Sequence, residues 1–478
     1  MIRHKDVYID GAWRPCSGDE VTEVVNPATE QVIATVPAAT ERDVDTAVAA
    51  ARAALPAWSR TAPAERRVLL ERLHQGLAKR ADEIAELITA EMGAPRQIAT
   101  RIQAGLPIAV SESYARLLET YEFEERIGNA LVVKEPLGVV AAITPWNYPL
   151  HQVVAKVAAA LAAGCTVVLK PSEITPLNAY LLAEAVDSAG FPAGVFNLVP
   201  GTGAVVGEAL VSHPGVDMVS FTGSTRAGKR IGELAAATVK KVALELGGKS
   251  AHIILPDADL KSAVRAGVAG VMRNSGQTCT ALTRLLVHRD SYERAIEVAR
   301  ETAESTVVGD PTDERTQMGP VASAAQRDTV RRYIAEAVAQ GARLVTGGIE
   351  PPVGLPTGYY VRPTVFADVT EDMTIAQEEI FGPVIVLMSY EDEEDALRIA
   401  NNSVYGLSGA VTSASEERAL AFARRLETGM IHVNSGPLNL LAPFGGYKQS
   451  GNGRELGVHG LEEFLQAKAL YLPASAPN

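Results

Sequence analysis

The segment RNSGQTCTALTR, residues 273–284, places one cysteine, Cys279, directly after a polar turn. The chain has only two other cysteines, Cys16 and Cys165, and Cys165 stands in an apolar run of the kind that buries a structural thiol. Thiolates are good nucleophiles toward carbonyl carbon when neighbouring N–H groups or cations stabilise them. The position of Cys279 therefore indicates a nucleophile that a substrate can reach, with an incidental loop cysteine as the alternative.

A cation and a carboxylate follow one of the buried strands. The predicted strand TVVLK ends at Lys170 and continues into Ser172 and Glu173. Open α/β sheets bind their ligands at this carboxyl edge, and an acidic group after the second strand is well placed for ribose hydroxyls. The residues predict a ribose site, and the alternative is a solvated Lys–Glu pair in a turn.

The stretch VSFTGSTRAGKR predicts a phosphate-binding turn. Its strand is expected to stop at Phe221 and its helix to begin near Thr225, which leaves Gly223 and Ser224 at a helix N-terminus. Free N–H groups and the positive end of the helix dipole attract a phosphate there.

The usual nucleotide fingerprints are missing or incomplete. The strand GVVAAIT runs into TPWNYP, which has no glycine, and GTGAVVG at 201–207 has the wrong spacing for GxGxxG. GSTRAGKR at 223–230 ends in arginine where an NTPase phosphate loop needs a hydroxyl, and ALELGGKS at 243–250 begins as an apolar strand. An NTPase is therefore not favoured.

Seven motifs in order connect these features to a known family. The chain resembles the NAD(P)-dependent aldehyde dehydrogenases over nearly its whole length, through ITPWNYP, KPSE, FTGST, LELGGKS, GQTC, QEEIFGPV and PFGGYKQSG. Any one motif is weak, but seven in register are highly specific. The resemblance implies oxidation of an aldehyde to a carboxylic acid with NAD as the hydride acceptor, in the non-acylating, hydrolytic type of the family.

The same resemblance implies the catalytic roles. Cys279 is the nucleophile that forms a thiohemiacetal and then a thioester, and the Asn147 side-chain amide holds the oxyanion together with the Cys279 backbone N–H. Glu245 is the general base that activates water for thioester hydrolysis. Lys156 and Glu455 occupy the places of a proton relay, with structural ion-pair residues as the alternative.

The resemblance also implies two sets of contacts. The cofactor contacts are Thr144, Pro145, Trp146, Lys170, Ser172, Glu173, Gly203, Phe221, Gly223, Ser224, Leu246, Gly247, Glu379 and Phe381. The substrate contacts are Asn147, His151, Thr278, Thr280 and Phe444, with Leu438 to Leu441 nearby. None of these residues amounts to an arginine clamp for an acidic substrate, so an apolar or aromatic aldehyde is favoured.

The cofactor preference and the rival functions follow from single residues. Glu173 would repel a 2′-phosphate, which favours NAD, although Lys170 and Arg226 leave NADP possible. One rival is a CoA-acylating semialdehyde dehydrogenase, against which Glu245 argues. The other is a catalytically idle NAD-binding protein on the same fold, against which the intact catalytic residues argue.

The elements that position these residues predict an α/β fold. Residues 40–95 show two helical patterns, and apolar strands alternate with helices from about residue 138, which is typical of a doubly wound parallel sheet. We expect a dinucleotide-binding domain with that sheet, a second α/β catalytic domain and a small β oligomerisation flap. The predicted ranges are 1–117 and 137–246 for NAD binding, 247–447 for catalysis, and 118–136 and 448–478 for oligomerisation.

Composition narrows the partners. A formal net charge of −13 over 478 residues, with no lysine- or arginine-rich run, opposes binding to nucleic acid or anionic membrane. A small-molecule aldehyde is the expected partner, in a homodimer or homotetramer. The polar N-terminus predicts a cytoplasmic protein, and the spacing of the cysteines argues against disulfides and against a metal site.

Overall fold

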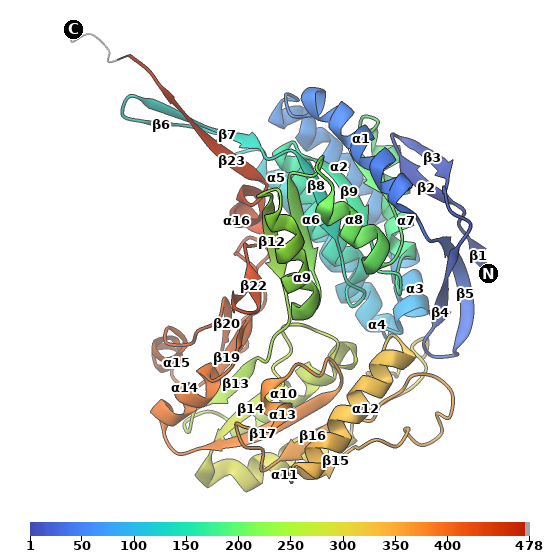
Figure 1. The fold of residues 1–478 in the computed structure, drawn as a ribbon. Helices are drawn as coiled ribbons and strands as arrows, with labels where there is room; N and C mark the ends of the chain where they lie inside the picture. Colours follow the sequence, from blue (N-terminus) through green and yellow to red (C-terminus); the bar gives the residue numbers. More distant parts are fainter. Residues whose placement is uncertain (474–478) are drawn as a thin grey trace.

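The computed structural model describes residues 1–473, and its two large sheets lie one above the other in Figure 1. The upper sheet has eight strands in the order β22-β12-β11-β8-β9-β10-β2-β3, and the five strands from β12 to β10 are parallel. These strands are β2 (Asp6–Ile9), β3 (Ala12–Pro15), β8 (Val139–Ile143), β9 (Thr166–Lys170), β10 (Phe196–Leu198), β11 (Met218–Thr222), β12 (Lys241–Glu245) and β22 (Gly451–Asn452).

Helices cover both faces of this sheet, as the uninterrupted apolar strands predict. In β8 the side chains of Val140 and Ala142 pack into one core and those of Val139 and Ala141 into another, because successive strand residues point to opposite faces. The first core is built with α2, α3, α5 (Gly105–Leu117), α6 (Pro149–Ala163) and α7 (Leu177–Ala189), and the second with α1, α8 (Glu208–Ser212) and α9 (Thr225–Ala236). The predicted doubly wound arrangement is confirmed.

The helical region before the sheet differs from the sequence prediction. Residues 40–95 form three helices instead of two: α1 (Glu41–Trp58), α2 (Pro63–Lys79) and α3 (Ala81–Met92). The apolar spacing continues without interruption across the last two, but Arg80 leaves the helical conformation with φ −106° and ψ 16°. Its guanidinium pairs with Glu83 and Glu184, which fixes the break through a contact distant in sequence.

The lower sheet has seven strands in the order β15-β16-β17-β14-β13-β19-β20, parallel except for β15. The predicted second α/β series is thereby confirmed. Its strands are β13 (Ala251–Ile254), β14 (Arg284–His288), β15 (Arg343–Thr346), β16 (Thr364–Ala367), β17 (Val384–Tyr390), β19 (Ser408–Thr412) and β20 (Met430–Val433). The helices packed on it are α10 (Leu260–Met272), α11 (Tyr292–Glu304), α12 (Ala324–Ala339), α14 (Glu393–Asn401) and α15 (Glu416–Ala423).

A small antiparallel sheet projects from the body of the molecule (Figure 1). It joins β6 (Glu124–Ile127) and β7 (Ala130–Pro136) to β23 (Leu465–Tyr471), far along the chain, as the two strand-like segments predict. The segment 448–478 does more than this, because its strand β22 pairs with β12 and extends the upper sheet. Residues 474–478 of that segment lie outside the described residues.

The remaining elements are short. A three-stranded sheet near the N-terminus is formed by β1 (Ile2–Arg3), β4 (Val21–Asn26) and β5 (Gln31–Pro37), and β18 (Tyr405–Gly406) pairs with β21 (Tyr447–Lys448). Short helical turns are α4 (Arg96–Ile98), η1 (Ala99–Ala104), η2 (Gly203–Gly207), η3 (Arg273–Gly276), η4 (Arg289–Ser291), α13 (Thr374–Gln377) and α16 (Gly457–Glu462). Within residues 1–473, no helix has the length and apolar character needed to cross a membrane.

A buried carboxylate joins two helices of the upper domain. Glu91 of α3 is 0% exposed and accepts hydrogen bonds from the Leu177 backbone N–H at 2.9 Å and from the Asn178 side-chain amide at 2.6 Å, at the start of α7. Burial raises the pKa of Glu91 to about 7. The folded chain therefore holds this proton more tightly than the unfolded chain.

We expect Glu91→Gln to change how stability depends on pH. A raised pKa in the fold gives stability that is fully present below the unfolded value of 4.5 and is lost as the pH rises through about 7. Between about pH 5.5 and about pH 8, the free energy of unfolding should fall by about 2 kcal/mol more in the unsubstituted chain than in Glu91→Gln. Denaturant titrations at both pH values measure this, with exposed Glu86→Gln as the control. Parallel pH profiles for the Glu91→Gln variant and the unsubstituted chain would contradict the assignment.

Candidate active site

The segment 246–250 brings the two sheets together. It runs directly from the end of β12 at Glu245 to the start of β13 at Ala251. A Cβ on Gly248 would lie 2.6 Å from the Cys279 carbonyl oxygen, and a Cβ on Gly247 would lie 2.2 Å from Glu379 Oε2. The two glycines of ELGGKS therefore permit a close approach of backbone that unites three segments distant in sequence.

The turn before Cys279 has an unusual backbone. Asn274 and Ser275 adopt the left-handed conformation, with φ 55° and 56°, and Gly276 follows with φ 72°. The Asn147 side-chain amide, in the loop between β8 and α6, donates to the Gln277 carbonyl at 3.0 Å. The structure thus places Asn147 against the segment that carries Cys279.

The surroundings of Cys279 favour a neutral thiol. Its side chain is partly exposed. Burial, with the negative charges of Glu379, Glu245 and Glu455, raises the pKa of the Cys279 thiol far above its usual range. A base that accepts the thiol proton would therefore help the Cys279 sulfur to attack a carbonyl carbon.

Glu245 is a buried carboxylate with unsatisfied oxygens. It is 5% exposed at the end of β12, and neither oxygen has a hydrogen-bond partner among residues 1–473. Burial, reinforced by the charge of Glu455, raises the pKa of Glu245 well above 4.5. A carboxylate with a raised pKa is a stronger base than an exposed one, which suits a general base.

Lys156 and Glu455 form an ion pair, and their side chains are 1% and 11% exposed. Lys156 lies on α6, and Glu455 is held by paired backbone hydrogen bonds to Phe444. Both side chains line a small cavity with Glu245, which offers about 10 Å³ to the centre of a water molecule. That volume holds about one water, so the structure brings these three residues together.

Lys170 is 3% exposed at the end of β9. Its Nζ donates to the carbonyls of Pro171 and Gly201 at 2.8 Å each, and it lies 3.4 Å from the half-exposed carboxylate of Glu173. Burial lowers the pKa of Lys170. Lys170 and Glu173 therefore do form the pair that was the alternative to a ribose site. The lysine of that pair is buried, however, and not solvated.

Other predicted cofactor contacts surround this edge. Ser172 Oγ accepts the Ile174 backbone N–H at 3.2 Å, and the Thr144 backbone N–H donates to the Lys170 carbonyl while the Thr144 hydroxyl has no partner within residues 1–473. Gly203 opens η2, whose last residue, Gly207, lies against the Lys170 side chain. GTGAVVG therefore lies beside Lys170, although its spacing does not fit the fingerprint.

The predicted phosphate turn has the expected form. The helix α9 begins at Thr225, and Ser224 caps it by accepting the Ala227 backbone N–H at 3.3 Å. A Cβ on Gly223 would lie 2.4 Å from the Phe221 ring, so a larger residue there would have to displace that ring. Leu246 is buried, and its backbone N–H donates to the Ser450 carbonyl at 2.9 Å.

Two aromatic rings meet between the loop after β8 and the EEIFGPV segment. Trp146, which follows Pro145, contacts Phe381 edge-on with ring centroids 5.3 Å apart. Phe381 itself has φ 57°, and strained backbone of this kind occurs often at ligand sites. Glu379 accepts the Gly248 backbone N–H at 3.0 Å, and burial raises the pKa of Glu379 to about 7.

The predicted substrate contacts come from three segments. The Thr278 and Tyr148 hydroxyls are 2.9 Å apart, on the turns that also carry Cys279 and Asn147. Burial lowers the pKa of His151 to about 4, so this imidazole is neutral. Thr280 is partly buried, as is Phe444, which packs against the core of the upper sheet.

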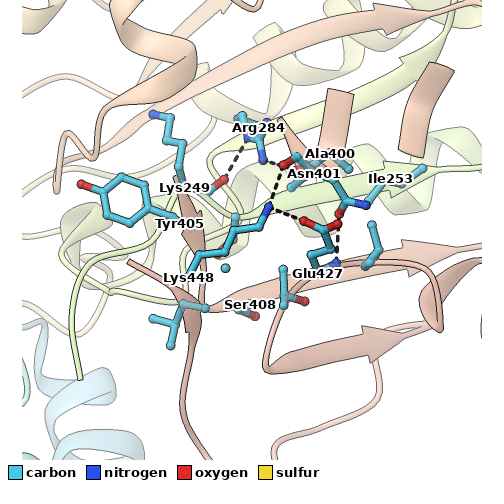
Figure 2. A pocket seen from close by; sticks show the side chains of 16 residues that line it. Lys249, Ile253, Arg284, Ala400, Asn401, Tyr405, Ser408, Glu427 and Lys448 are labelled. Carbon is cyan, nitrogen blue, oxygen red and sulfur yellow. Dashed lines mark hydrogen bonds and ion pairs between the residues drawn. The ribbon is translucent and has the colours of Figure 1, made fainter. Parts of the chain in front are cut away.

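Arg284 fixes the exit from the cysteine turn. Its buried guanidinium donates to the backbone carbonyls of Lys249, Ile399 and Ala400 at 2.9, 2.8 and 2.7 Å. Figure 2 shows this side chain at the wall of a pocket where Lys448 pairs with Glu427. Arg284 therefore ties the Cys279 segment to the chain that leaves Glu245.

Sequence reasoning missed several residues that hold the site. Asn274 and Gln277 were visible inside the first motif, where a polar turn signals hydrogen bonding. Tyr148 follows Asn147 directly and Arg284 ends the segment that contains Cys279, but neither belongs to a sequence pattern that indicates a function. Gln103, which contacts Asn147 and Asn274, lies in a helical region with no local indication of function.

Comparison with known proteins agrees with this geometry. The sequence profile of the aldehyde dehydrogenase family matches residues 13–470. A 3-succinoylsemialdehyde-pyridine dehydrogenase from a Pseudomonas species is 52% identical over 471 residues, which cover 98% of this chain and 99% of that protein.

Solved structures give the same result. A mutant of aldehyde dehydrogenase C from Pseudomonas syringae, in complex with NAD+ and octanal, is 48% identical with a TM-score of 0.98 and covers 99% of this chain and 98% of its own. An aldehyde dehydrogenase from Mycobacterium tuberculosis, complexed with NAD+, is 42% identical with a TM-score of 0.97, and the coverage is 100% of both chains. The predicted family, fold class and enzyme class are confirmed. The chain belongs to the aldehyde dehydrogenase family, whose members are NAD(P)-dependent oxidoreductases that act on aldehydes.

Proposed function

We propose that the chain oxidises an aldehyde to a carboxylic acid with NAD, through a thioester on Cys279 that Glu245-activated water hydrolyses. One observation carries this proposal. The backbone of ELGGKS lies against Cys279, and the same segment begins with a buried carboxylate that has no hydrogen-bond partner in the described part of the chain. A nucleophile and a base of raised pKa therefore converge.

The first step is addition of the Cys279 sulfur to the carbonyl carbon. Because burial and the neighbouring carboxylates raise the pKa of the thiol, a base that accepts its proton assists the addition, and Glu245 has two oxygens without a partner among residues 1–473. The tetrahedral oxyanion accepts from the Cys279 backbone N–H and from the Asn147 amide. An amide NH2 carries two N–H donors, and only one of them points at the Gln277 carbonyl.

Loss of hydride from the tetrahedral adduct, which a bound nicotinamide would accept, would give the thioester. The step that follows is hydrolysis of that thioester. Glu245 removes a proton from water, the resulting oxygen attacks the acyl carbon, and the Cys279 sulfur leaves with its electron pair. The small cavity beside Glu245, Lys156 and Glu455 offers a path by which that proton leaves the base. The Lys156–Glu455 pair supplies both signs of charge there, which supports the proposed relay.

The residues at the upper sheet fit a dinucleotide. The buried Lys170 ammonium and the half-exposed Glu173 carboxylate suit the adenosine ribose, and the N-terminus of α9 suits a phosphate. Glu379 and Phe381 lie where the ribose and ring of nicotinamide would be held, beside Gly247. When bound, the nicotinamide supplies the hydride acceptor that no protein side chain can replace.

We expect Glu173→Ser to shift cofactor preference toward NADP. The Glu173 carboxylate opposes a 2′-phosphate by charge repulsion, so its removal should improve kcat/KM for NADP by about tenfold, while a ribose hydrogen bond lost from NAD lowers that value by a similar factor. Initial rates with both cofactors measure the switch. Glu208→Ser, an exposed carboxylate paired with Arg230, is the control and should leave the ratio unchanged. An unchanged NADP:NAD ratio in Glu173→Ser would place the ribose elsewhere.

For the substrate we propose an apolar or aromatic aldehyde. The negative charges of Glu379, Glu245 and Glu455 act on Cys279, which disfavours an anionic substrate. The solved structure of the Pseudomonas syringae relative contains octanal, an aliphatic aldehyde. The 52% identical relative is named for a semialdehyde that bears a pyridine ring. A panel of aliphatic, aromatic and carboxylate-bearing aldehydes, assayed by NADH absorbance, tests the class, and a preference for the carboxylate-bearing members would contradict it.

The larger organisation is proposed on the same basis. We infer an NAD-binding unit from residues 1–117 and 137–246, a catalytic unit from 247–447, and an oligomerisation role for 118–136 and 448–478. The projecting sheet of β6, β7 and β23 supports self-association, because Ile127, Leu470 and Tyr471 are exposed on it. Light scattering of the purified protein distinguishes a homodimer from a homotetramer. We also propose a cytoplasmic location.

A further inference from the structure

Gln103 is a wholly buried amide with no part in the reaction described so far. It lies in η1, a π-helical segment between α4 and α5, and it is 0% exposed. π-helical turns are uncommon and frequently occur at functional sites, because the extra residue redirects the side chains that follow. Here the redirected side chain reaches the two turns that carry the reacting groups.

The Gln103 amide donates to both of those turns. Its Nε2 lies 2.9 Å from the Asn147 carbonyl oxygen and 3.2 Å from Asn274 Oδ1. The Asn274 amide in turn donates to the Asn147 carbonyl at 3.1 Å and to the Gln277 carbonyl at 3.2 Å. With the bond from Asn147 to Gln277, these four residues form a closed network that joins the upper sheet to the cysteine turn.

The network leaves each amide one orientation. Rotating the Gln103 amide would face its oxygen toward two other acceptors, and rotating Asn274 would do the same at the Asn147 and Gln277 carbonyls. Asn274 also has a left-handed backbone, which persists only where the surroundings over-determine it. Gln103 is therefore the buried donor from outside both turns that fixes them relative to each other.

We propose that Gln103 is a positioning residue for the oxyanion site, holding the Asn147 amide and the Cys279 backbone N–H in one arrangement. The inference rests on the proposed function, in which those two groups hold the oxyanion. Displacing a reacting group by about 1 Å lowers a rate by roughly 10²-fold, so loss of this bridge should be visible in catalysis without any change in what contacts the substrate.

A double-mutant cycle tests the proposal on the full-length enzyme. Gln103→Leu removes the donor and keeps most of the volume, and it should lower kcat/KM for an aldehyde by about 10²-fold while the affinity for NAD, read by protein fluorescence, stays unchanged. Asn147→Ala should lower kcat/KM by about 10²–10³-fold. If Gln103 acts through the oxyanion site, adding Gln103→Leu to Asn147→Ala should lower kcat/KM by much less than the roughly 10²-fold that Gln103→Leu causes alone.

If the losses of kcat/KM in the two single variants multiply in the double variant, the two residues act independently and the proposal is overturned. A Gln103→Leu enzyme whose kcat/KM lies within about twofold of the unsubstituted enzyme would also overturn it. If Gln103→Leu does not fold, Gln103→Met takes its place in the same cycle. Ser111→Ala is the matched control. Ser111 is a buried polar residue of the adjoining α5 whose hydroxyl donates to the Ile108 carbonyl and lies 3.5 Å from His74 Nδ1, away from both turns, so its effect should be small and multiplicative.

The outcome separates this inference from the function on which it rests. A fully active Asn147→Ala enzyme would remove the oxyanion assignment itself, whatever Gln103 does. A crippled Asn147→Ala beside a harmless Gln103→Leu would overturn the role of Gln103 alone.

Discussion

Cys279→Ala is expected to lower the oxidation of any aldehyde by roughly 10⁴-fold or more, because no other group in the described site can form the thioester. Only three cysteines are present, and Cys16 and Cys165 lie in other parts of the upper domain, with Cys165 fully buried. The affinity for NAD should be unchanged, since none of the residues proposed to hold its adenosine half is altered. Steady-state NADH formation and fluorescence titration measure the two effects.

The matched control for this experiment is Cys16→Ala. Cys16 is partly exposed, 3.4 Å from Asp43, and far in the sequence from the site, so its removal should leave the rate within about twofold. Preserved aldehyde oxidation in Cys279→Ala would refute the covalent mechanism. Loss of NAD binding in the same variant would instead mean that the site had been disordered.

Glu245→Gln is expected to separate the two halves of the reaction. The amide cannot accept a proton from water, so hydrolysis of any thioester that forms should slow by about 10²–10⁴-fold. If adventitious base still deprotonates the thiol at high pH, rapid mixing should show a burst of NADH that approaches one equivalent per site. Mass spectrometry of the quenched enzyme should show the acyl group on Cys279.

The dependence of the rate on pH is a second test of Glu245 as the general base. Burial and the charge of Glu455 raise the pKa of Glu245, so the unsubstituted enzyme should become faster as the pH rises through that raised value and the carboxylate appears. Glu245→Gln should lose this rise. Glu233→Gln, an exposed carboxylate near Arg230, should keep it. Rapid transfer of the acyl group to added CoA, with no hydrolysis in the unsubstituted enzyme, would favour the acylating alternative.

The burial of all three acidic groups near Cys279 has a physical consequence for the order of events. Burial of the thiol, together with the charges of Glu379, Glu245 and Glu455, raises the pKa of Cys279 and so favours the neutral sulfur. A neutral thiol is a poor nucleophile and is also oxidised slowly, because the thiolate is the reactive form. The site therefore keeps its sulfur unreactive until a base or a positively charged group changes the local charge.

Much of the site could be read from local sequence because the chemistry depends on short segments. Cys279, Glu245 and Asn147 each belong to a turn or strand end whose residue types are set by close backbone approach, as the glycines after Glu245 show. The strands of both sheets were also predictable, since uninterrupted apolar runs can only be buried on two faces. Helix boundaries were less so: Arg80 ends α2 through an ion pair with Glu184, which no local pattern records.

By itself, the sequence determined the alternation of apolar strands and helices, and which residue types stand where the strands end. Only the tertiary structure decided the charge state of the thiol, the pairing of Lys156 with Glu455 and the bridge made by Gln103. The reason is that desolvation and long-range hydrogen bonds depend on what surrounds a group in space, whereas backbone propensity and apolar periodicity depend on its neighbours along the chain.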